Sequence, residues 1–127
     1  MLRRSPLKDW RGRISQPKYG VKTEKDVYVQ ARDGTRLVVN IHRPDAPGKF
    51  AALLALSPYG KELLLPPQTL GRSALWDGNI EAGDSPYIVS RGYAHVIGDL
   101  RGTGDSEGEC VGLHPKSEGE NGYDLVE

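Results

Sequence analysis

The stretch Ala94–Glu109, A-H-V-I-G-D-L-R-G-T-G-D-S-E-G-E, decides how the rest of the chain is interpreted. It begins as an apolar strand, Ala94–Ile97, and continues as a loop of glycines and charged residues. An apolar run that opens into glycines is typical of a buried strand that delivers a loop to the edge of a sheet. In an open α/β sheet, ligands bind at that edge.

The same loop contains the pattern G-x-S-x-G at Gly104–Gly108, which resembles a nucleophile elbow. An elbow needs a strand, a strained one-residue turn and then a helix at once. Here the residues Leu100–Gly104 lie between the strand and Ser106, and two glycines and a proline follow instead of a helix start. We therefore expect Ser106 to lie in a connecting loop, because a glycine-rich chain meets this short pattern easily by chance.

The composition is that of a globular domain with balanced charge. The chain has 127 residues, which is enough for one domain with its own core. Seventeen basic and seventeen acidic residues cancel, which argues against nucleic acid or an anionic membrane as a partner. A basic excess is confined to residues 1–22, which we expect to form an arm ahead of the folded domain at 23–127.

The single cysteine, Cys110, excludes an internal disulfide and fits a reducing compartment. No stretch reaches the ~18 apolar residues of a membrane span, and no apolar core of a secretory signal follows the basic N-terminal residues. The expected location is therefore the cytoplasm. No second histidine or cysteine stands at metal-ligand spacing, so neither a metal nor another cofactor is expected.

The residues before the central stretch predict a hairpin and a buried strand. Lys25–Ala31 and Arg36–His42 alternate in polarity, and the Asp-Gly pair between them is a strong hairpin signal. Phe50–Leu56 is apolar on both faces, as expected of a central parallel strand that helices cover on both sides. The next residues, Ser57–Gly60, read S-P-Y-G and place the hydroxyl of Tyr59 where the strand meets a loop.

Two helices are expected. Asp84–Pro86 combines a capping acceptor with a proline in the first turn, which predicts a short helix over Pro86–Arg91. The polar segment His114–Gly122 is expected to be flexible, and a second helix is expected to begin at Tyr123 and run for about one turn. The connection 61–83 is long enough to be a lid or a binding loop.

Two histidines fall in predicted strands and are interpreted as structural. His42 lies on the more polar face of its strand and is expected to be exposed, with no partner nearby. His95 lies inside the strand that precedes the glycine loop and is expected to be hydrogen-bonded. Three carboxylates of the long connection could contact a substrate amine, although loop carboxylates are usually just solvated: Glu62, Asp77 and Glu81.

The order of these elements is that of the first half of an α/β-hydrolase sheet. Five segments then resemble one family: Arg32–Leu37, Leu54–Lys61, Arg91–Tyr93, Gly98–Glu109 and Gly122–Glu127. They closely resemble the X-Pro dipeptidyl-peptidase and cocaine-esterase-like acyl hydrolases. The D-x-R-G-x-G-x-S loop is shared by many α/β hydrolases, but its combination with the S-P-Y-G strand end is far more specific.

The resemblance implies a fold and a mechanism. The fold is α/β: the N-terminal half of an α/β-hydrolase fold, with a β-hairpin and then parallel strands joined by crossover helices, truncated before the nucleophile elbow. The family implies acyl transfer by a Ser-His-Asp triad, whose three members would lie outside this chain. It also implies that Tyr59 donates its hydroxyl to the oxyanion, with a small peptide or an ester as substrate.

Three functional interpretations remain open. In the first, the chain is the N-terminal part of a serine hydrolase, inactive alone and prone to self-association through an open sheet edge. In the second, it is a self-contained hydrolase with Ser106 as nucleophile, His114 as base and Asp99 or Asp105 as the orienting acid. Catalysis then requires these loop residues to be held with a rigidity that no scaffold provides. In the third, it is a non-catalytic remnant that binds a partner.

Overall fold

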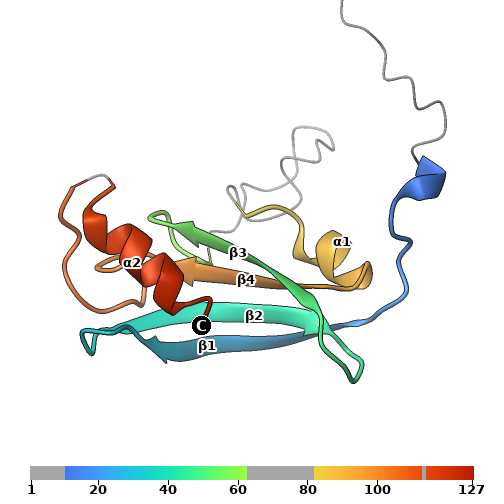
Figure 1. Ribbon diagram of the computed structural model, residues 1–127, viewed down its shortest axis with the longest axis horizontal. Coiled ribbons are helices and arrows are strands. Elements are labelled where there is room, and N and C mark those ends of the chain that lie inside the picture. The colour runs from blue at the N-terminus through green and yellow to red at the C-terminus, as the bar shows by residue number, and fades with distance from the viewer. Residues whose placement is uncertain (1–10, 63–81, 113) are drawn as a thin grey trace, which may run out of the picture.

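The computed structural model describes residues 11–62, 82–112 and 114–127 of the chain. Its elements are, in order, η1 (Arg11–Arg13), β1 (Val21–Gln30), β2 (Arg36–Pro44), β3 (Ala51–Ser57), α1 (Ser85–Ser90), β4 (Tyr93–Asp99) and α2 (Lys116–Asp124). The four strands form one mixed sheet in the order β1-β2-β4-β3 (Figure 1). Only the pair β3–β4 is parallel among these strands, so the predicted sequence of hairpin and parallel strands is confirmed.

The hairpin between β1 and β2 turns at the Asp-Gly pair, as the sequence predicts. The Ala31 N–H donates to the Thr35 carbonyl at 2.9 Å, and the Gly34 N–H donates to the Ala31 carbonyl at 2.8 Å. Gly34 has a φ of +89°, a conformation that glycine adopts without a steric penalty. The Asp33 carboxylate also accepts the Thr35 N–H at 3.1 Å, which closes the turn with a side chain.

A β-bulge interrupts β1 between Glu24 and Val27, where the register against β2 shifts. The bulged residue Asp26 has a φ of +53°. Its N–H donates to the side-chain oxygen of Asn40 on β2 at 3.0 Å, so the disrupted ladder is satisfied by a side chain. The bulge has a consequence for the candidate site, because it places the Asp26 carboxylate against Lys61.

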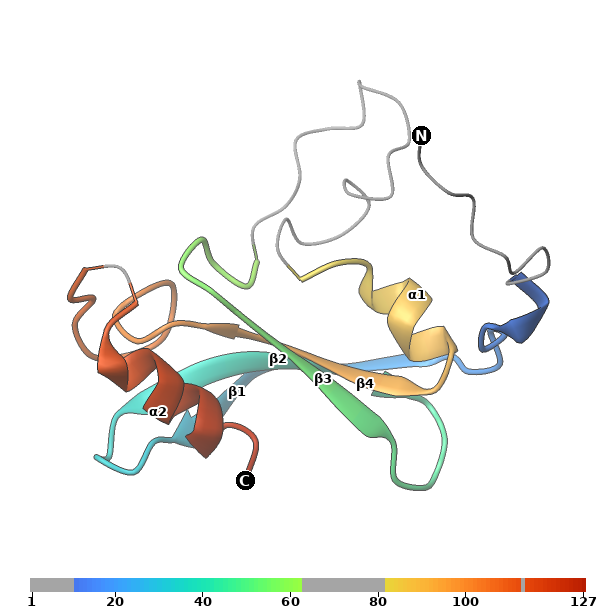
Figure 2. The same cartoon turned by 45° about the horizontal axis from the view of Figure 1, so that its top comes forward.

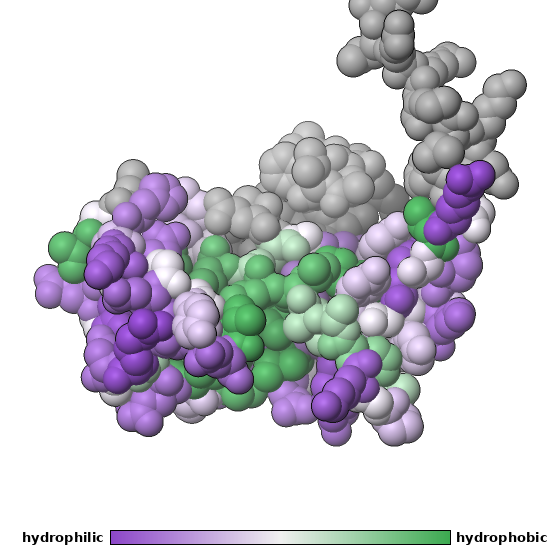
Figure 3. All heavy atoms as spheres, in the orientation of Figure 1, coloured by the Kyte–Doolittle hydropathy of each residue, from purple (hydrophilic) through white to green (hydrophobic). Residues whose placement is uncertain are grey.

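β3 lies at the edge of the described sheet, which differs from the central position that its apolar sequence predicts. Its first residues are exposed, and Leu53 retains 47% of its accessible surface. Figure 3 shows apolar side chains gathered across the middle of the face of the molecule that is turned toward the viewer, between α2 and the opposite end of the sheet. An apolar edge strand presents both unpaired backbone groups and apolar side chains to other chains.

α1 begins as the sequence predicts. The Asp84 side chain accepts the Tyr87 N–H at 3.2 Å, and Pro86 occupies the first turn. The side chain of Val89, within the helix, is fully buried, and Gly92 follows the end of the helix with a φ of +94°. Figure 2 shows α1 over β4 near one end of the sheet and α2 near the other end, where β3 and β4 terminate.

The structural role predicted for His95 is confirmed. Its ring is buried, and Nδ1 lies 2.8 Å from the Ser85 hydroxyl at the start of α1. The prediction for His42 is wrong, because the ring is half-buried and Nδ1 lies 3.0 Å from the Thr23 hydroxyl on β1. Burial lowers the pKa of both imidazoles below the ordinary value.

This burial predicts a pH-dependent stability. The positive charge that His42 can carry adds to the effect of burial on the pKa of His95, while Asp84 opposes it. Because the folded pKa is below the unfolded value of about 6.5, the unfolded state binds more protons in the interval between them. Stability should therefore be fully present above pH ~6.5 and decline as the pH falls below it, by at most about 1.4 kcal/mol per pH unit for one group.

Urea unfolding between pH 7.5 and 5.5 tests this expectation. His95→Gln should flatten the decline, whereas His114→Gln, which alters a side chain that is 87% exposed, should leave it unchanged. Equal slopes in the parent chain and His95→Gln would contradict the assignment.

α2 departs from the sequence-based expectation. The segment predicted to be flexible, His114–Gly122, contains most of the helix, and Tyr123 lies in its last turn instead of its first. Gly119 and Gly122 make the local sequence a poor helix former, since each glycine costs about 1 kcal/mol relative to alanine. Contacts from distant residues therefore decide the conformation.

Two arginines hold α2 against the rest of the protein. The Arg32 guanidinium donates to both carboxylate oxygens of Asp124, with Nη2–Oδ1 at 2.6 Å and Nε–Oδ2 at 3.2 Å. Arg101 Nε donates to the buried Asn121 side chain at 2.9 Å. A Cβ at Gly122 would lie 3.8 Å from Leu56, an ordinary van der Waals distance, which places the end of the helix beside β3. None of the described helices is long and apolar enough to cross a membrane.

Candidate functional site

The carboxyl ends of β3 and β4 meet at one edge of the sheet, where Ser57 pairs with Asp99. The turn Ser57–Lys61 leaves β3 at this edge and carries Tyr59, whose side chain points outward and is 61% exposed. The loop 100–115 leaves β4 beside it and leads to α2. In an open α/β sheet, this is the edge at which ligands bind.

The backbone beneath Tyr59 is fixed by Ser57. The buried Ser57 hydroxyl accepts the Tyr59 N–H at 3.1 Å, and the Ser57 carbonyl accepts the Leu100 N–H at 3.3 Å. Gly60 follows with a φ of +96°, which turns the chain back toward the sheet. The phenol of Tyr59 therefore projects from a short turn whose first residue is tied to both β3 and the start of the β4 loop.

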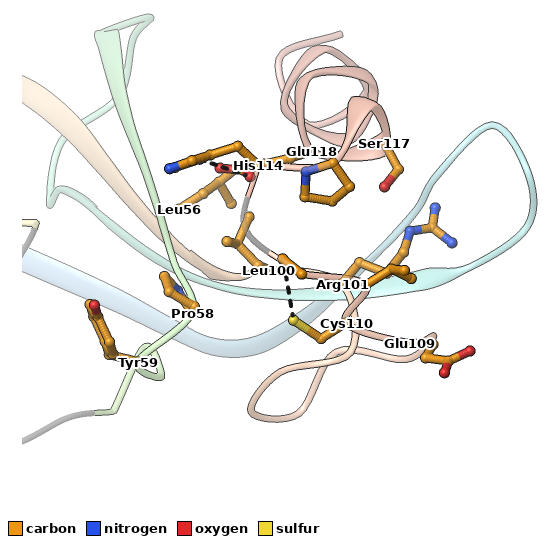
Figure 4. Close-up of a pocket in the computed structure, with 13 residues that line it drawn as sticks. Leu56, Pro58, Tyr59, Leu100, Arg101, Glu109, Cys110, His114, Ser117 and Glu118 are labelled. Atoms are coloured by element: carbon orange, nitrogen blue, oxygen red, sulfur yellow. Dashed lines mark hydrogen bonds and ion pairs between the residues drawn. The ribbon is translucent and has the colours of Figure 1, made fainter.

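Tyr59 also lines a pocket of about 410 Å³ between the end of β3, the β4 loop and the start of α2 (Figure 4). Figure 4 shows Leu56 and Leu100 near its centre, with Tyr59 at one end and Glu109 at the other. His114 contributes to the wall while its Nδ1 lies 3.4 Å from Glu118. The volume of this pocket falls within the ~300–1,000 Å³ that is typical of small-molecule binding sites.

A buried cluster of charges lies behind the turn. The Lys61 ammonium is almost inaccessible to solvent and lies 2.8 Å from Asp26, 2.5 Å from Asp105 and 3.7 Å from Asp99. Burial alone would lower the pKa of Lys61, but hydrogen bonds to Asp105 and Asp26 and the charge of Asp99 raise it above its ordinary value. Lys61 is therefore charged at neutral pH.

Asp99 joins the turn to the glycine loop. Its buried carboxylate accepts the Lys61 N–H at 2.6 Å and the Asp105 N–H at 2.9 Å. Gly104 makes this possible, because a Cβ there would lie 2.3 Å from the Asp99 carboxylate. Among the described residues, no group of three or more histidine, cysteine, aspartate or glutamate side chains is placed to hold a metal ion.

Ser106 has the structural position that its sequence context predicts. It lies in the loop between β4 and α2, and its hydroxyl is buried. That hydroxyl accepts the Val38 N–H at 2.9 Å and donates to the Asp99 carbonyl at 2.8 Å. Both bonds tie the loop to β2 and β4. Because the next helix, α2, begins only at Lys116, Ser106 does not have the strand–turn–helix geometry of a nucleophile elbow.

Replacing Ser106 with alanine should therefore destabilise the fold and leave any hydrolysis unchanged. The Val38 N–H would lose its buried acceptor, which costs about 1–3 kcal/mol. Chemical denaturation measures the loss. Ser90→Ala is the matched control, because that hydroxyl bonds within an exposed turn of α1 and its removal should cost less than about 0.5 kcal/mol. Equal stabilities for the two variants would contradict the anchoring role of Ser106.

The triad of the self-contained hydrolase does not assemble in these contacts. Ser106 forms hydrogen bonds with backbone groups, and His114 lies against Glu118. The carboxylate of Asp99 accepts the Lys61 N–H, and that of Asp105 pairs with the Lys61 ammonium. Of the three carboxylates considered for a substrate amine, Asp77 and Glu81 lie outside the described residues. Glu62 pairs with Lys25 at 3.0 Å and accepts from Asn40 at 2.7 Å.

Further ion pairs connect the hairpin to the glycine loop. Arg101 pairs with Asp33 at 2.9 Å and donates to the Thr35 hydroxyl at 2.6 Å, and the hydrogen bond from Arg101 holds the pKa of Asp33 well below its ordinary range. Arg36 pairs with Glu107 at 2.5 Å. The loop is thereby fixed to the hairpin on one side and to the Tyr59 turn on the other.

The mixed sheet, with the ends of its parallel strands at one edge, has the architecture of part of an α/β-hydrolase fold. Residues 33–127 match the X-Pro dipeptidyl-peptidase (S15 family), and the chain belongs to this family. Both the predicted family and the predicted fold class are thereby confirmed.

Three relatives show the extent of the similarity. The cocaine esterase of Rhodococcus sp. (strain MB1 Bresler) is 42% identical over 86 residues, which are 68% of this chain and 13% of the relative. The crystal structure of a CocE/NonD family hydrolase from Staphylococcus aureus superposes with a TM-score of 0.72 at 28% identity, covering 86% of this chain and 23% of that one. An α-amino acid ester hydrolase gives a TM-score of 0.53 at 25% identity, covering 85% and 17%. The chain therefore spans less than a quarter of the length of each relative.

Sequence reasoning missed the Lys61 cluster, although a signal for it was present. Lys61 follows the end of one strand, and Asp99 and Asp105 follow the end of its parallel neighbour. Because such ends meet at one edge, charges of opposite sign placed there are expected to pair. Asp26 carried no comparable signal, since its position depends on the bulge in β1.

Proposed function

We propose that this chain is the N-terminal part of a serine hydrolase that cleaves a small peptide or ester through an acyl-enzyme, and that Tyr59 donates a hydrogen bond to its oxyanion. The observation that carries the proposal is the placement of Tyr59, exposed at the carboxyl edge of the parallel pair on a turn fixed from both sides. The relatives' names support the reaction class, since an esterase, an ester hydrolase and a dipeptidyl-peptidase all transfer acyl groups.

The chemistry needs such a donor. When a serine oxygen adds to the substrate carbonyl, the carbon–oxygen π electrons move to the carbonyl oxygen, which becomes an oxyanion. A phenolic O–H aimed at that oxygen stabilises the charge as it develops, and stabilisation ends when the tetrahedral intermediate collapses and expels the alcohol or amine. In this proposal, the nucleophile, the acid and the histidine base come from outside the chain.

The isolated chain is accordingly proposed to be inactive. Treatment with a fluorophosphonate probe should give no labelling above background, and a nitrophenyl ester should not be hydrolysed faster than in buffer. Reading the transcript past codon 127 should reveal a further apolar strand followed by a new G-x-S-x-G. Labelling of the isolated chain that Ser106→Ala abolishes would instead establish a self-contained hydrolase, and a genuine stop codon after Glu127 would reduce the hydrolase assignment to ancestry.

The open edge of β3 supports self-association of the isolated chain. Sedimentation velocity should show species larger than a monomer that increase with concentration. Leu53→Lys should reduce them, because it places a charge on an apolar edge residue that is 47% exposed. Lys49→Glu, two residues before the start of β3, is a charge-changing control that should leave association unchanged. A chain that stays monomeric at every concentration tested would contradict this expectation.

The proposal also assigns a compartment and a class of partner. A single cysteine and balanced charge support a cytoplasmic enzyme that acts on a small molecule, without nucleic acid or membrane partners. A non-catalytic remnant that binds a partner is the alternative, and no contact in the described residues favours it over the hydrolase.

A further inference from the structure

One buried charge has no role in the proposed reaction. The Lys61 ammonium contacts carboxylates from three separate parts of the chain: Asp26 on the β1 bulge, Asp99 at the end of β4, and Asp105 in the glycine loop. The lysine side chain and Asp99 are each 1% exposed, whereas Asp26 and Asp105 are 58% and 64% exposed. An ammonium in this position links the β1 bulge to the end of β4 and to the glycine loop, two segments that the Asp105 N–H also joins through Asp99.

The cluster lies directly beside Tyr59 in the chain. Lys61 is two residues beyond Tyr59, and its N–H donates to Asp99 at 2.6 Å. Ser57, two residues before Tyr59, holds the other side of the turn through its hydroxyl. The exposed phenol thus stands between two anchors, one formed by hydrogen bonds at Ser57 and one formed by charges at Lys61.

We propose that Lys61 is a positioning residue whose buried ammonium, held by Asp26, Asp99 and Asp105, fixes the turn that presents Tyr59. The consequence for catalysis rests on the function proposed above, but the ordering of the turn does not. Oxyanion donors are effective only when they are preorganised, because their alignment then costs nothing as the charge develops. The structure assigns that preorganisation to the lysine.

Neutralising the lysine should release the turn. Without the ammonium, the carboxylates of Asp26, Asp99 and Asp105 would repel one another, and the turn would lose the side chain that joins it to the β1 bulge and the glycine loop. Asp99 would be left as a buried charge with no counter-ion, so Lys61→Met is also expected to weaken folding. Asp105→Asn is the milder variant, since it removes one ion pair at a side chain that is mostly exposed.

The test uses the ¹⁵N-labelled 127-residue chain. Backbone order parameters of Tyr59 and Gly60 should fall from about 0.85 toward 0.6 or below in Asp105→Asn and Lys61→Met. Exchange of the Lys61 amide should accelerate by about tenfold or more, while amides in β4 keep their protection. Lys61→Arg, which retains the positive charge, should restore part of the order.

Arg36→Met is the matched control. It removes an ion pair of the same length, Arg36–Glu107 at 2.5 Å, from the same loop without touching the Tyr59 turn. The order parameters of Tyr59 and Gly60 should be unchanged in this variant. A folded Asp105→Asn chain with an ordered turn, or equal disorder in Arg36→Met, would overturn the proposal.

A second measurement separates this inference from the proposed function. In the enzyme expressed from the complete reading frame, Asp105→Asn should lower kcat with little change in KM, and should have no further effect in a Tyr59→Phe background. If Tyr59→Phe leaves kcat intact, the oxyanion role fails although the ordering result can still hold. If Tyr59→Phe lowers kcat but Asp105→Asn leaves the turn ordered, the positioning role alone fails.

Discussion

Under the proposed oxyanion role, Tyr59→Phe should lower kcat by ~10²–10³ in the catalytically complete enzyme, because removal of one oxyanion donor has an effect of this size. The phenyl ring keeps the shape of the side chain, and only the hydroxyl is lost. Since the donor acts on charge that develops in the transition state, KM should change little. Steady-state kinetics with an activated ester and a peptide substrate measure the effect for both reaction classes.

The control for this prediction is Tyr28→Phe. Tyr28 on β1 is 59% exposed, close to the 61% of Tyr59, and its ring lies beneath the Arg36 guanidinium away from the β3 turn. Its hydroxyl should have no effect on kcat. If the two variants were equally active, the donor would have to be sought in another residue.

Gly102→Ala should destabilise the domain more than Gly112→Ala, a substitution in the same loop whose added Cβ meets nothing within 4 Å. Gly102 has a φ of +70°, and a Cβ there would lie 2.2 Å from the Cys110 nitrogen and 2.5 Å from the Glu109 carbonyl carbon. These are backbone atoms, so no side-chain rotation relieves the clash. The penalty combines about 1–2 kcal/mol for the left-handed conformation with about 1–3 kcal/mol for displacing the packed loop.

Gly112→Ala isolates the steric part of this penalty. Gly112 belongs to the same loop and has almost the same φ, +73°, but a Cβ there would meet nothing within 4 Å. Only the conformational cost of about 1–2 kcal/mol should remain. Urea unfolding of both variants gives the difference directly. Equal destabilisation would mean that the close approach of Gly102 to Cys110 is not needed for the fold.

The elements that local signals determine could be predicted from the sequence. The Asp-Gly turn, the Asp84 cap and the apolar run before the glycine loop each specify a short piece of backbone, and the structure contains all three. The failure at α2 has the opposite cause. Two glycines make its sequence unfavourable for a helix, and the partners that stabilise it, Arg32 and Arg101, come from distant parts of the chain.

The candidate site divides in the same way. Tyr59 could be identified because it belongs to the S-P-Y-G segment that resembles the family. Lys61 belongs to the same segment, but its burial as an ion could not be predicted, because its three partners lie between 35 and 44 residues away in sequence. The edge position of β3 could not be derived from its apolar sequence. An apolar run indicates that a strand is buried, but it does not say which other segments cover or flank that strand.

The family-like segments also explain one another through their contacts. Arg32 of the first segment pairs with Asp124 of the last, and Lys61 of the second pairs with Asp105 of the glycine loop. Residues that looked like separate sequence signatures are thus the two ends of single ion pairs. A substitution in one segment should therefore be compensated most readily by a change in its partner segment.

The order of strands in the sheet means that neighbouring strands leave the ribosome at different times during synthesis. β2 lies between β1 and β4, and Val39 pairs with Gly98, so its second neighbour leaves the ribosome about 60 residues later. At about 5–20 residues per second, that interval lasts roughly 3–12 s. During this time Leu37 and Val39, both buried in the finished sheet, belong to a hairpin with one open side. Until β4 arrives, the edge of β2 that later pairs with it can form the same backbone hydrogen bonds with another chain.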